Sequence, residues 1–235
     1  MSIPNIAAIT FMQNLSGSVF PIFDSIIIYF GAKGLQTSMF HLEVNKQLRC
    51  LSHAYTREMS GDVIDDKLFN HFQPFVQAEW EKVKTSTPDP RIIPDVTQKM
   101  LMRTMQNLRQ TVRQIKTQTN TQSDIVGTVT LIPFDEDIEV KISQSEFESI
   151  VRRDLEVSVQ RTLEAAIDKA SKKFQNLNLH YVRWTGGSSL LPLFQNLVRD
   201  FFTQQGMFYF FIFFHIFLMN LISLKSFATI LICLF

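Results

Sequence analysis

Two glycine-containing stretches carry residue types that could bind a phosphate group. The first, Gly186-Gly187-Ser188-Ser189, lies between a short predicted strand at 180–185 and a helical pattern that begins near Ser188. Main-chain amides at a helix N-terminus, with no Cβ in the way, suit a phosphate or the edge of a nucleotide. The alternative is a tight turn from strand to helix, which is the commoner reason for such a glycine pair.

The second stretch is Gly31-Ala32-Lys33-Gly34, which follows an apolar run. It is a second candidate phosphate loop, although it lacks the Gly-x-x-x-x-Gly-Lys-Ser/Thr order of a Walker A motif. The alternative is the turn of a β-hairpin, which the same glycines favour.

The remaining charged groups are less specific. The helical pattern at 95–118 has a basic face that could contact phosphate, but such faces are more often solvated; it contains Arg103, Arg109, Arg113 and Lys116. The acidic segments 65–66 and 135–137 lack the spacing of a calcium loop, so we expect solvated carboxylates there. The five histidines form no metal-like cluster, and no Gly-x-Ser-x-Gly elbow or Cys/His pairing is present. The residues alone therefore indicate no metal site and no hydrolase or transferase centre.

Composition limits the class of protein. The chain has 235 residues, 46% of them hydrophobic, which is enough for one or two packed domains. Its net charge of +1 argues against a dedicated nucleic-acid-binding protein, which would be clearly basic. The two cysteines, Cys50 and Cys233, give neither a disulfide framework nor zinc spacing, so we expect a reducing, intracellular compartment.

Hydrophobic periodicity predicts the elements that position these loops. Short apolar or alternating runs predict strands at 25–30, 35–42, 47–54, 126–132, 137–142 and 180–185. Apolar residues at helical spacing predict helices at 60–84, 95–118, 143–176 and 191–201. Ser143, with Glu146 three residues later, forms a capping box at the start of the longest helix. We therefore expect an α/β fold with long helices.

The C-terminal segment 206–235 differs from the rest of the chain. No Asp, Glu, Lys or Arg occurs between Phe201 and Leu224, a stretch long enough to span a bilayer. One interpretation is a membrane anchor. The other, which we favour, is translation of a retained intron, because Gly206-Met207 can be encoded by a splice-donor-like sequence and AT-rich introns translate into Phe, Ile and Leu.

Three separated segments share a pattern, in the same order along the chain. They are Gly61-Asp62-Val63-Ile64-Asp65-Asp66-Lys67-Leu68-Phe69-Asn70-His71-Phe72, Ser143-Gln144-Ser145-Glu146-Phe147-Glu148 and the segment 182–202, which includes Gly186-Gly187-Ser188 and ends in Asp200-Phe201-Phe202. Together they resemble the seventy-kilodalton heat-shock (DnaK-type) chaperones.

This resemblance implies lobe II of an actin-like ATPase domain, with a ribonuclease H-like fold. Its larger subdomain would comprise 1–60 and 143–205, and an inserted α+β subdomain would comprise 61–142. In the family this lobe holds one side of ATP, and the whole protein is an ATP-driven folding chaperone. The positions implied to bind ATP or ADP are Gly31, Gly34, Lys116, Gly186, Gly187 and Ser188.

Departures from the family pattern reduce the expected activity. The stretch Phe30-Gly31-Ala32-Lys33-Gly34 lacks the acidic residue of the family's second phosphate loop, and Leu190 replaces an arginine that packs on adenine. In the adenosine-binding helix only Lys116 survives, where the other family positions fall on Arg113, Thr117 and Asn120. Lobe I has no counterpart here. We therefore expect weak or lost nucleotide binding and no ATP hydrolysis by this chain alone.

The resemblance also implies partners and a location. Leu35-Gln36-Thr37-Ser38-Met39-Phe40 and Glu43-Val44-Asn45 are most similar to the atypical, ribosome-associated branch of the family. Unfolded clients or co-chaperones would bind through domains absent here. We expect a cytoplasmic location, and association with a membrane only if the segment 206–235 is genuine. The alternatives are a non-enzymatic co-chaperone or interaction module, either ribosome-associated or membrane-anchored, and a non-functional truncated gene product.

Overall fold

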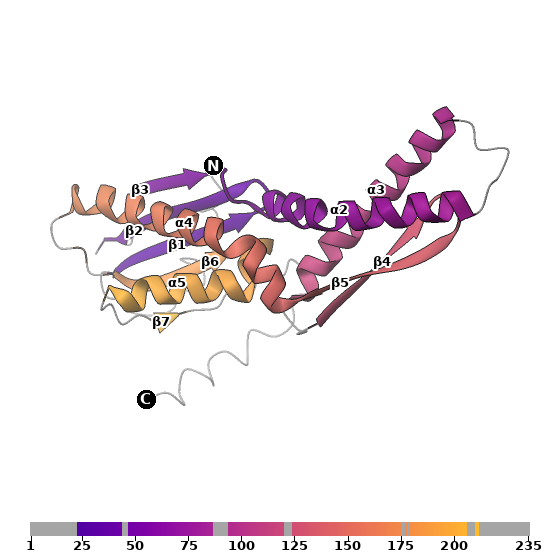
Figure 1. Ribbon diagram of the computed structural model, residues 1–235. Helices are drawn as coiled ribbons and strands as arrows, with labels where there is room; N and C mark the ends of the chain where they lie inside the picture. Colours follow the sequence, from indigo (N-terminus) through magenta and orange to yellow (C-terminus); the bar gives the residue numbers. More distant parts are fainter. Residues whose placement is uncertain are drawn as a thin grey trace, which may run out of the picture.

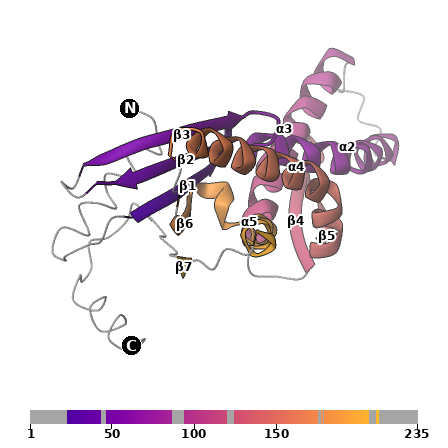
Figure 2. The same ribbon diagram turned by 90° about the vertical axis from the view of Figure 1, so that its left-hand side faces the viewer.

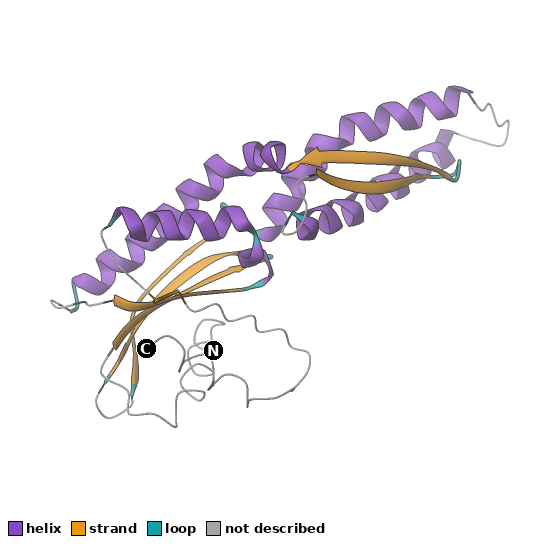
Figure 3. Cartoon of the chain, turned by 90° about the horizontal axis from the view of Figure 1, so that it is seen from below, coloured by secondary structure: helices purple, strands orange, loops and turns teal. Residues whose placement is uncertain are grey.

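The structure is a computed structural model of the chain, and its elements form an elongated molecule (Figure 1). A five-stranded sheet with two helices occupies one end, and two long helices with a β-hairpin occupy the other (Figures 1 and 3). The structure describes residues 23–43, 47–86, 94–119, 124–174, 177, 179–205 and 210–211.

The sheet has the strand order β3-β2-β1-β6-β7. Strands β1 and β2 and strands β2 and β3 pair antiparallel, whereas β6 lies parallel to β1 and β7 parallel to β6. The strands predicted at 25–30, 35–42, 47–54 and 180–185 are confirmed. Their bounds are β1 Phe23–Gly31, β2 Gly34–Leu42, β3 Leu48–Thr56, β6 Leu179–Thr185 and β7 Phe210–Phe211.

The centre of strand β1 is a continuous apolar run because both of its faces are buried. Ile26, Ile28 and Phe30 point into the main core, where helices α4 (Gln144–Ser171) and α5 (Pro192–Gln204) cover the sheet (Figure 2). The Phe30 and Phe194 rings lie 4.9 Å apart between β1 and α5. Ile27 points to the other face and packs with Phe40. A continuous apolar run is typical of a strand in this position.

Helix α4 begins where its capping residue predicts. Ser143 has an extended backbone, and its Oγ accepts a hydrogen bond from the Glu146 amide. Along the helix, residues at helical spacing are buried in the core, including Phe147, Val151, Leu155, Val159, Leu163, Ala166 and Ala170. The helix ends at Ser171 rather than near Asn176.

Strand β3 forms one edge of the sheet, and hydrogen bonds attach helix α4 to this strand. Ser52 Oγ donates a hydrogen bond to the Ala166 carbonyl at 2.6 Å. In the other direction, the Lys169 and Lys173 amines donate to main-chain carbonyls of β3, those of His53 and Leu51.

The other end of the molecule is built from helices α2 (Gly61–Ser86) and α3 (Pro94–Gln118) and the hairpin of β4 (Asp124–Leu131) and β5 (Glu136–Ser143). The hairpin and both helices follow the predicted pattern. Their shared core is continuous with that of the sheet and contains Trp80, Leu108, Val112, Ile115, Ile125 and Val129. Trp80 Nε1 donates to the Ile132 carbonyl at 2.7 Å, which joins the end of α2 to the hairpin turn.

Several predictions concern residues outside the described ranges. These include most of the segment 206–235, of which only the short strand β7 is described, and Asn120. Among the described residues, none of the helices combines the length and the apolar character that a membrane crossing requires.

Candidate functional site

The Gly186-Gly187 pair lies where β6 ends, and its two glycines have different surroundings. Gly186 has φ +101°, and a Cβ there would lie 2.3 Å from the Phe30 carbonyl oxygen. Its own carbonyl accepts hydrogen bonds from the Ser189 amide and hydroxyl. Gly186 is therefore required by the tight turn that we considered as the alternative. A Cβ on Gly187 would meet nothing within 4 Å, so local packing does not require glycine there.

The turn is followed by a short 3₁₀-helix, η1 (Gly187–Leu190), and only then by α5. The helix that we expected to begin near Ser188 is therefore two separate elements. Leu190, at the position where the family has an adenine-packing arginine, is partly exposed at the end of η1.

The stretch 31–34 forms a β-hairpin turn. Gly31 and Gly34 are the last pair of the β1–β2 ladder, with Ala32 and Lys33 between them. The carbonyls of this turn are already engaged: Ala32 O accepts from the Asp62 amide at 2.9 Å, and Lys33 O accepts from the Tyr55 hydroxyl at 3.1 Å. The hairpin alternative is thus the observed conformation.

Tyr29 lies over both glycine loops, which the sequence did not reveal. A Cβ added to Gly31 would lie 2.3 Å from Tyr29 Oη, and one added to Gly186 would lie 3.1 Å from Tyr29 Cε2. The ring therefore approaches both loops closely. Residues i and i+2 of a strand lie on the same face. An aromatic residue two positions before a glycine at the end of a strand therefore indicates that its ring can lie over that glycine.

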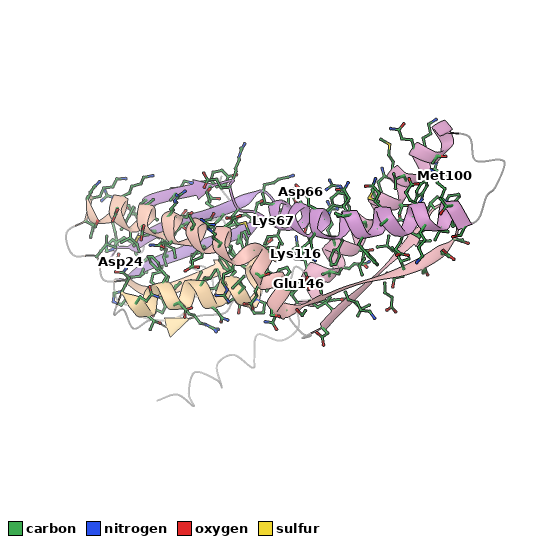
Figure 4. The ribbon with its side chains drawn as sticks, viewed as in Figure 1. Asp24, Asp66, Lys67, Met100, Lys116 and Glu146 are labelled. Carbon is green, nitrogen blue, oxygen red and sulfur yellow. The ribbon has the colours of Figure 1, made fainter. Side chains whose placement is uncertain are left out.

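Gly61, the first residue of α2, brings the loops together. A Cβ on Gly61 would lie 2.5 Å from Ser188 Oγ and 3.2 Å from Ala32 Cα. On its other side, Lys116 from α3 donates to the Gly61 carbonyl at 3.0 Å. Four segments distant in sequence therefore meet here: the 31–34 turn, the start of α2, the end of α3 and the 186–188 loop. Figure 4 shows Lys116 at this junction between the sheet and the α2–α3 pair.

The predicted site residues are thus largely gathered in one region. Gly31 and Ser188 lie around Gly61, and Lys116 contacts Gly61 directly, whereas Gly186 lies against Phe30 and Tyr29. Gly34 lies at the outer side of the hairpin, where a Cβ would meet Tyr55 and the Thr56 carbonyl.

The basic face of α3 is not simply solvated, which corrects our expectation. Lys116 Nζ lies 2.5 Å from Asp65 Oδ1, and Arg113 lies 3.6 Å from the same carboxylate. Arg109 contacts Asp66 at 2.8 Å. Asp65 is buried rather than solvated, because α3 packs directly against this face of α2. A single helix cannot reveal such pairing, because the partner charges lie on another element.

A small surface pocket opens between these two helices. It has a volume of about 130 Å³ and is lined by Asp62, Asp65, Asp66, Arg109 and Arg113. Asp62 also pairs with Lys33 of the hairpin turn at 2.5 Å. Within the described ranges, no group of three or more His, Cys, Asp or Glu side chains could hold a metal ion. The arrangement offers main-chain amides, one buried amine and paired surface charges.

Comparison with known proteins identifies relatives of this chain. The family model described as Hsp70 protein matches residues 24–207. Heat shock 70 kDa protein 15 and heat shock 70 kDa protein 14 of Arabidopsis thaliana are each 27% identical over 159 residues. That alignment covers 68% of this chain and 17% of each relative, so the chain matches about a sixth of their length. Because the family match extends from the start of β1 past the end of α5, the chain belongs to the Hsp70 family.

Proposed function

We propose that this chain supplies lobe II of the nucleotide-binding domain of an Hsp70-type chaperone. Its larger subdomain comprises 1–60 and 143–205, and its smaller, inserted subdomain comprises 61–142. The chain order supports this division, because α2, α3, β4 and β5 all fall between β3 and α4 and build their own end of the molecule (Figure 1).

The proposed ligand is ATP or ADP, bound where the glycine loops meet Lys116. The observation that carries this proposal is the convergence of four separate segments around Gly61. Gly187 has open space above it, and Ser188 follows it in the same turn. Amides without a neighbouring side chain, close to an amine, are chemically suited to a phosphate or ribose edge.

We propose that the affinity is low and that the chain alone does not hydrolyse ATP. Lys116 already contacts Asp65, and the adenine-packing position is occupied by Leu190 instead of a cation. The stretch Phe30-Gly31-Ala32-Lys33-Gly34 lacks the acidic residue of the family's phosphate loop. Phosphoryl transfer depends on groups that clamp the phosphates from both sides, and a single lobe offers one side only.

The test is ligand-dependent stability of the full chain, together with an assay of ATP turnover. ADP at about ten times its dissociation constant should stabilise the fold by about 1.4 kcal/mol, which raises Tm by roughly 2–6 °C. Lys116→Gln should weaken this effect, whereas Lys99→Gln, an exposed change on the same helix, should leave it unchanged. No shift at millimolar ADP would overturn the proposed site, and ATP turnover above buffer would overturn the single-lobe interpretation.

A second candidate function is a non-enzymatic interaction module. The pairing of Arg109, Arg113 and Lys116 with carboxylates of α2 favours it, because these cations are not free to meet a phosphate. The same titration separates the two: ligand-induced stabilisation supports the nucleotide site, and its absence supports the module. Binding of clients or co-chaperones, ribosome association, a cytoplasmic location and any membrane contact of 206–235 stay predictions.

A further inference from the structure

The side chain of Tyr29 occupies the space between the two glycine loops. A Cβ built on Gly31 would lie 2.3 Å from Tyr29 Oη, 2.5 Å from its Cζ and 2.6 Å from its Cε1. On the other side, a Cβ built on Gly186 would lie 3.1 Å from Tyr29 Cε2. The ring is therefore in contact with both loops, and a phosphate has no room between the ring and either glycine.

The strand pairing explains why one ring reaches both loops. Tyr29 is paired with Thr185 of β6, the residue directly before Gly186, and it precedes Gly31 by two residues along β1. Residues two apart on a strand lie on the same face of the sheet. The ring therefore lies at the point where β1 and β6 end, which is also where the proposed phosphate site begins.

Packing alone holds this ring in place. Tyr29 is half-buried, and within the part of the chain that the structure describes its hydroxyl makes no hydrogen bond. Tyr55, at the same hairpin, differs in this respect: its hydroxyl donates to the Lys33 carbonyl and accepts from Arg57 Nε, each at 3.1 Å. Tyr29 can therefore change its side-chain rotamer without the loss of a hydrogen bond.

We propose that Tyr29 is an autoinhibitory gate, whose ring covers the glycine loops in the nucleotide-free chain and rotates away before a phosphate can reach them. The inference rests on the proposed function, because it concerns access to the same site. When a ligand binds only the open form, its apparent dissociation constant is the intrinsic constant divided by the open fraction. The ring of Tyr29 therefore lowers the affinity for ADP and ATP, and its removal restores it.

The experiment measures the binding of ADP and of adenosine to the full chain by calorimetry in buffer that contains magnesium. Tyr29→Val removes the ring and keeps a residue that favours strands, so ADP should bind on the order of tenfold more tightly. Adenosine, which carries no phosphate, should change in affinity by less than about twofold. Tyr29→Phe keeps the ring and should bind ADP as the wild-type protein does.

Tyr55→Val is the matched control, because Tyr29 and Tyr55 are both paired with Gln36 across the sheet and lie on the same face. It should change ADP affinity by less than about twofold, since Tyr55 lies on the outer side of the hairpin. Circular dichroism and urea unfolding establish that each variant is folded before it is titrated. Tyr29→Thr, a second ring-free variant with a strand-favouring residue, provides the test if Tyr29→Val does not fold.

The other outcomes separate the gate from the proposed function. Unchanged or weaker ADP binding in folded Tyr29→Val overturns the inference, and so does an equal gain in Tyr55→Val, which would indicate a loosened hairpin. In both cases the proposed function survives, since the wild-type protein still binds ADP. ADP binding by Tyr29→Val alone supports the gate but leaves the wild-type chain without nucleotide binding. If no folded protein in the series binds ADP, the gate and the proposed function both fail.

Discussion

Replacement of Gly186 with alanine should destabilise the fold far more than the same change at Gly187. At Gly186 the backbone has φ +101° and ψ 151°, a region that residues with a Cβ rarely adopt, and the strain costs about 1–3 kcal/mol. The new methyl group would also lie 2.3 Å from the Phe30 carbonyl oxygen, and relief of that contact requires a further 1–3 kcal/mol, roughly. The expected loss is therefore about 2–6 kcal/mol.

Gly187→Ala is the matched control, because the two glycines are adjacent in the same loop. Nothing lies within 4 Å of the position that its Cβ would take. The change should leave stability unaltered or raise it by roughly 0.4–1 kcal/mol, since alanine restricts the unfolded chain. Equilibrium urea unfolding of the full chain, followed by far-UV circular dichroism, gives both free energies of unfolding.

The comparison has a clear refuting result. If Gly186→Ala lies within about 1 kcal/mol of Gly187→Ala, the tight turn does not depend on glycine, and the geometric argument is wrong. A large difference in stability would show that the fold requires glycine at position 186. If Gly187→Ala also keeps its nucleotide-induced stabilisation, glycine at position 187 is not needed for nucleotide binding.

Three further changes test other parts of the structure. Trp80→Phe should lower the free energy of unfolding by about 1–3 kcal/mol in urea titrations, because the Ile132 carbonyl loses its indole donor inside the core. Ser143→Ala should cost about 1 kcal/mol in the same assay, because Ser143 Oγ caps the Glu146 amide at the start of α4; no loss would contradict the capping role. Burial, and secondarily a nearby lysine, lowers the pKa of His53 below 6.5, so its contribution to stability is complete above that pH and is lost as the pH falls. His53→Gln should therefore show a weaker decline in stability than the wild-type protein between pH 7.5 and 5; parallel declines would contradict it.

The elements of this fold could be predicted from sequence because their signals are local. The apolar run at 25–30 predicts a buried strand, and Ser143 with Glu146 predicts the start of α4; both predictions are confirmed. The end of that helix was predicted a few residues too late, because no strong stop signal follows Ser171.

The site was only partly predictable because its key contacts are long-range. Gly31, Lys116 and Ser188 were found as candidates, but their common neighbour Gly61 was not. Asp65 was expected to be solvated, because its sequence neighbours do not show that α3 covers it. The free energy of a buried charge depends on the charged groups that face it. The partners of Asp65 are Arg113 and Lys116, which lie about fifty residues away along the chain.

The lysines of α4 along strand β3 have a consequence for self-association. An edge strand offers unpaired carbonyls on which a strand from another molecule can form, and this is how sheet aggregates grow. Here the ammonium groups of Lys169 and Lys173 donate to the carbonyls of His53 and Leu51, respectively, and place positive charge along the edge. Acetylation of these two lysines would remove the charge and leave each side chain with a single neutral amide N–H as donor. Strand β3 would then lose the positive charge that disfavours the addition of a strand from another molecule at this edge.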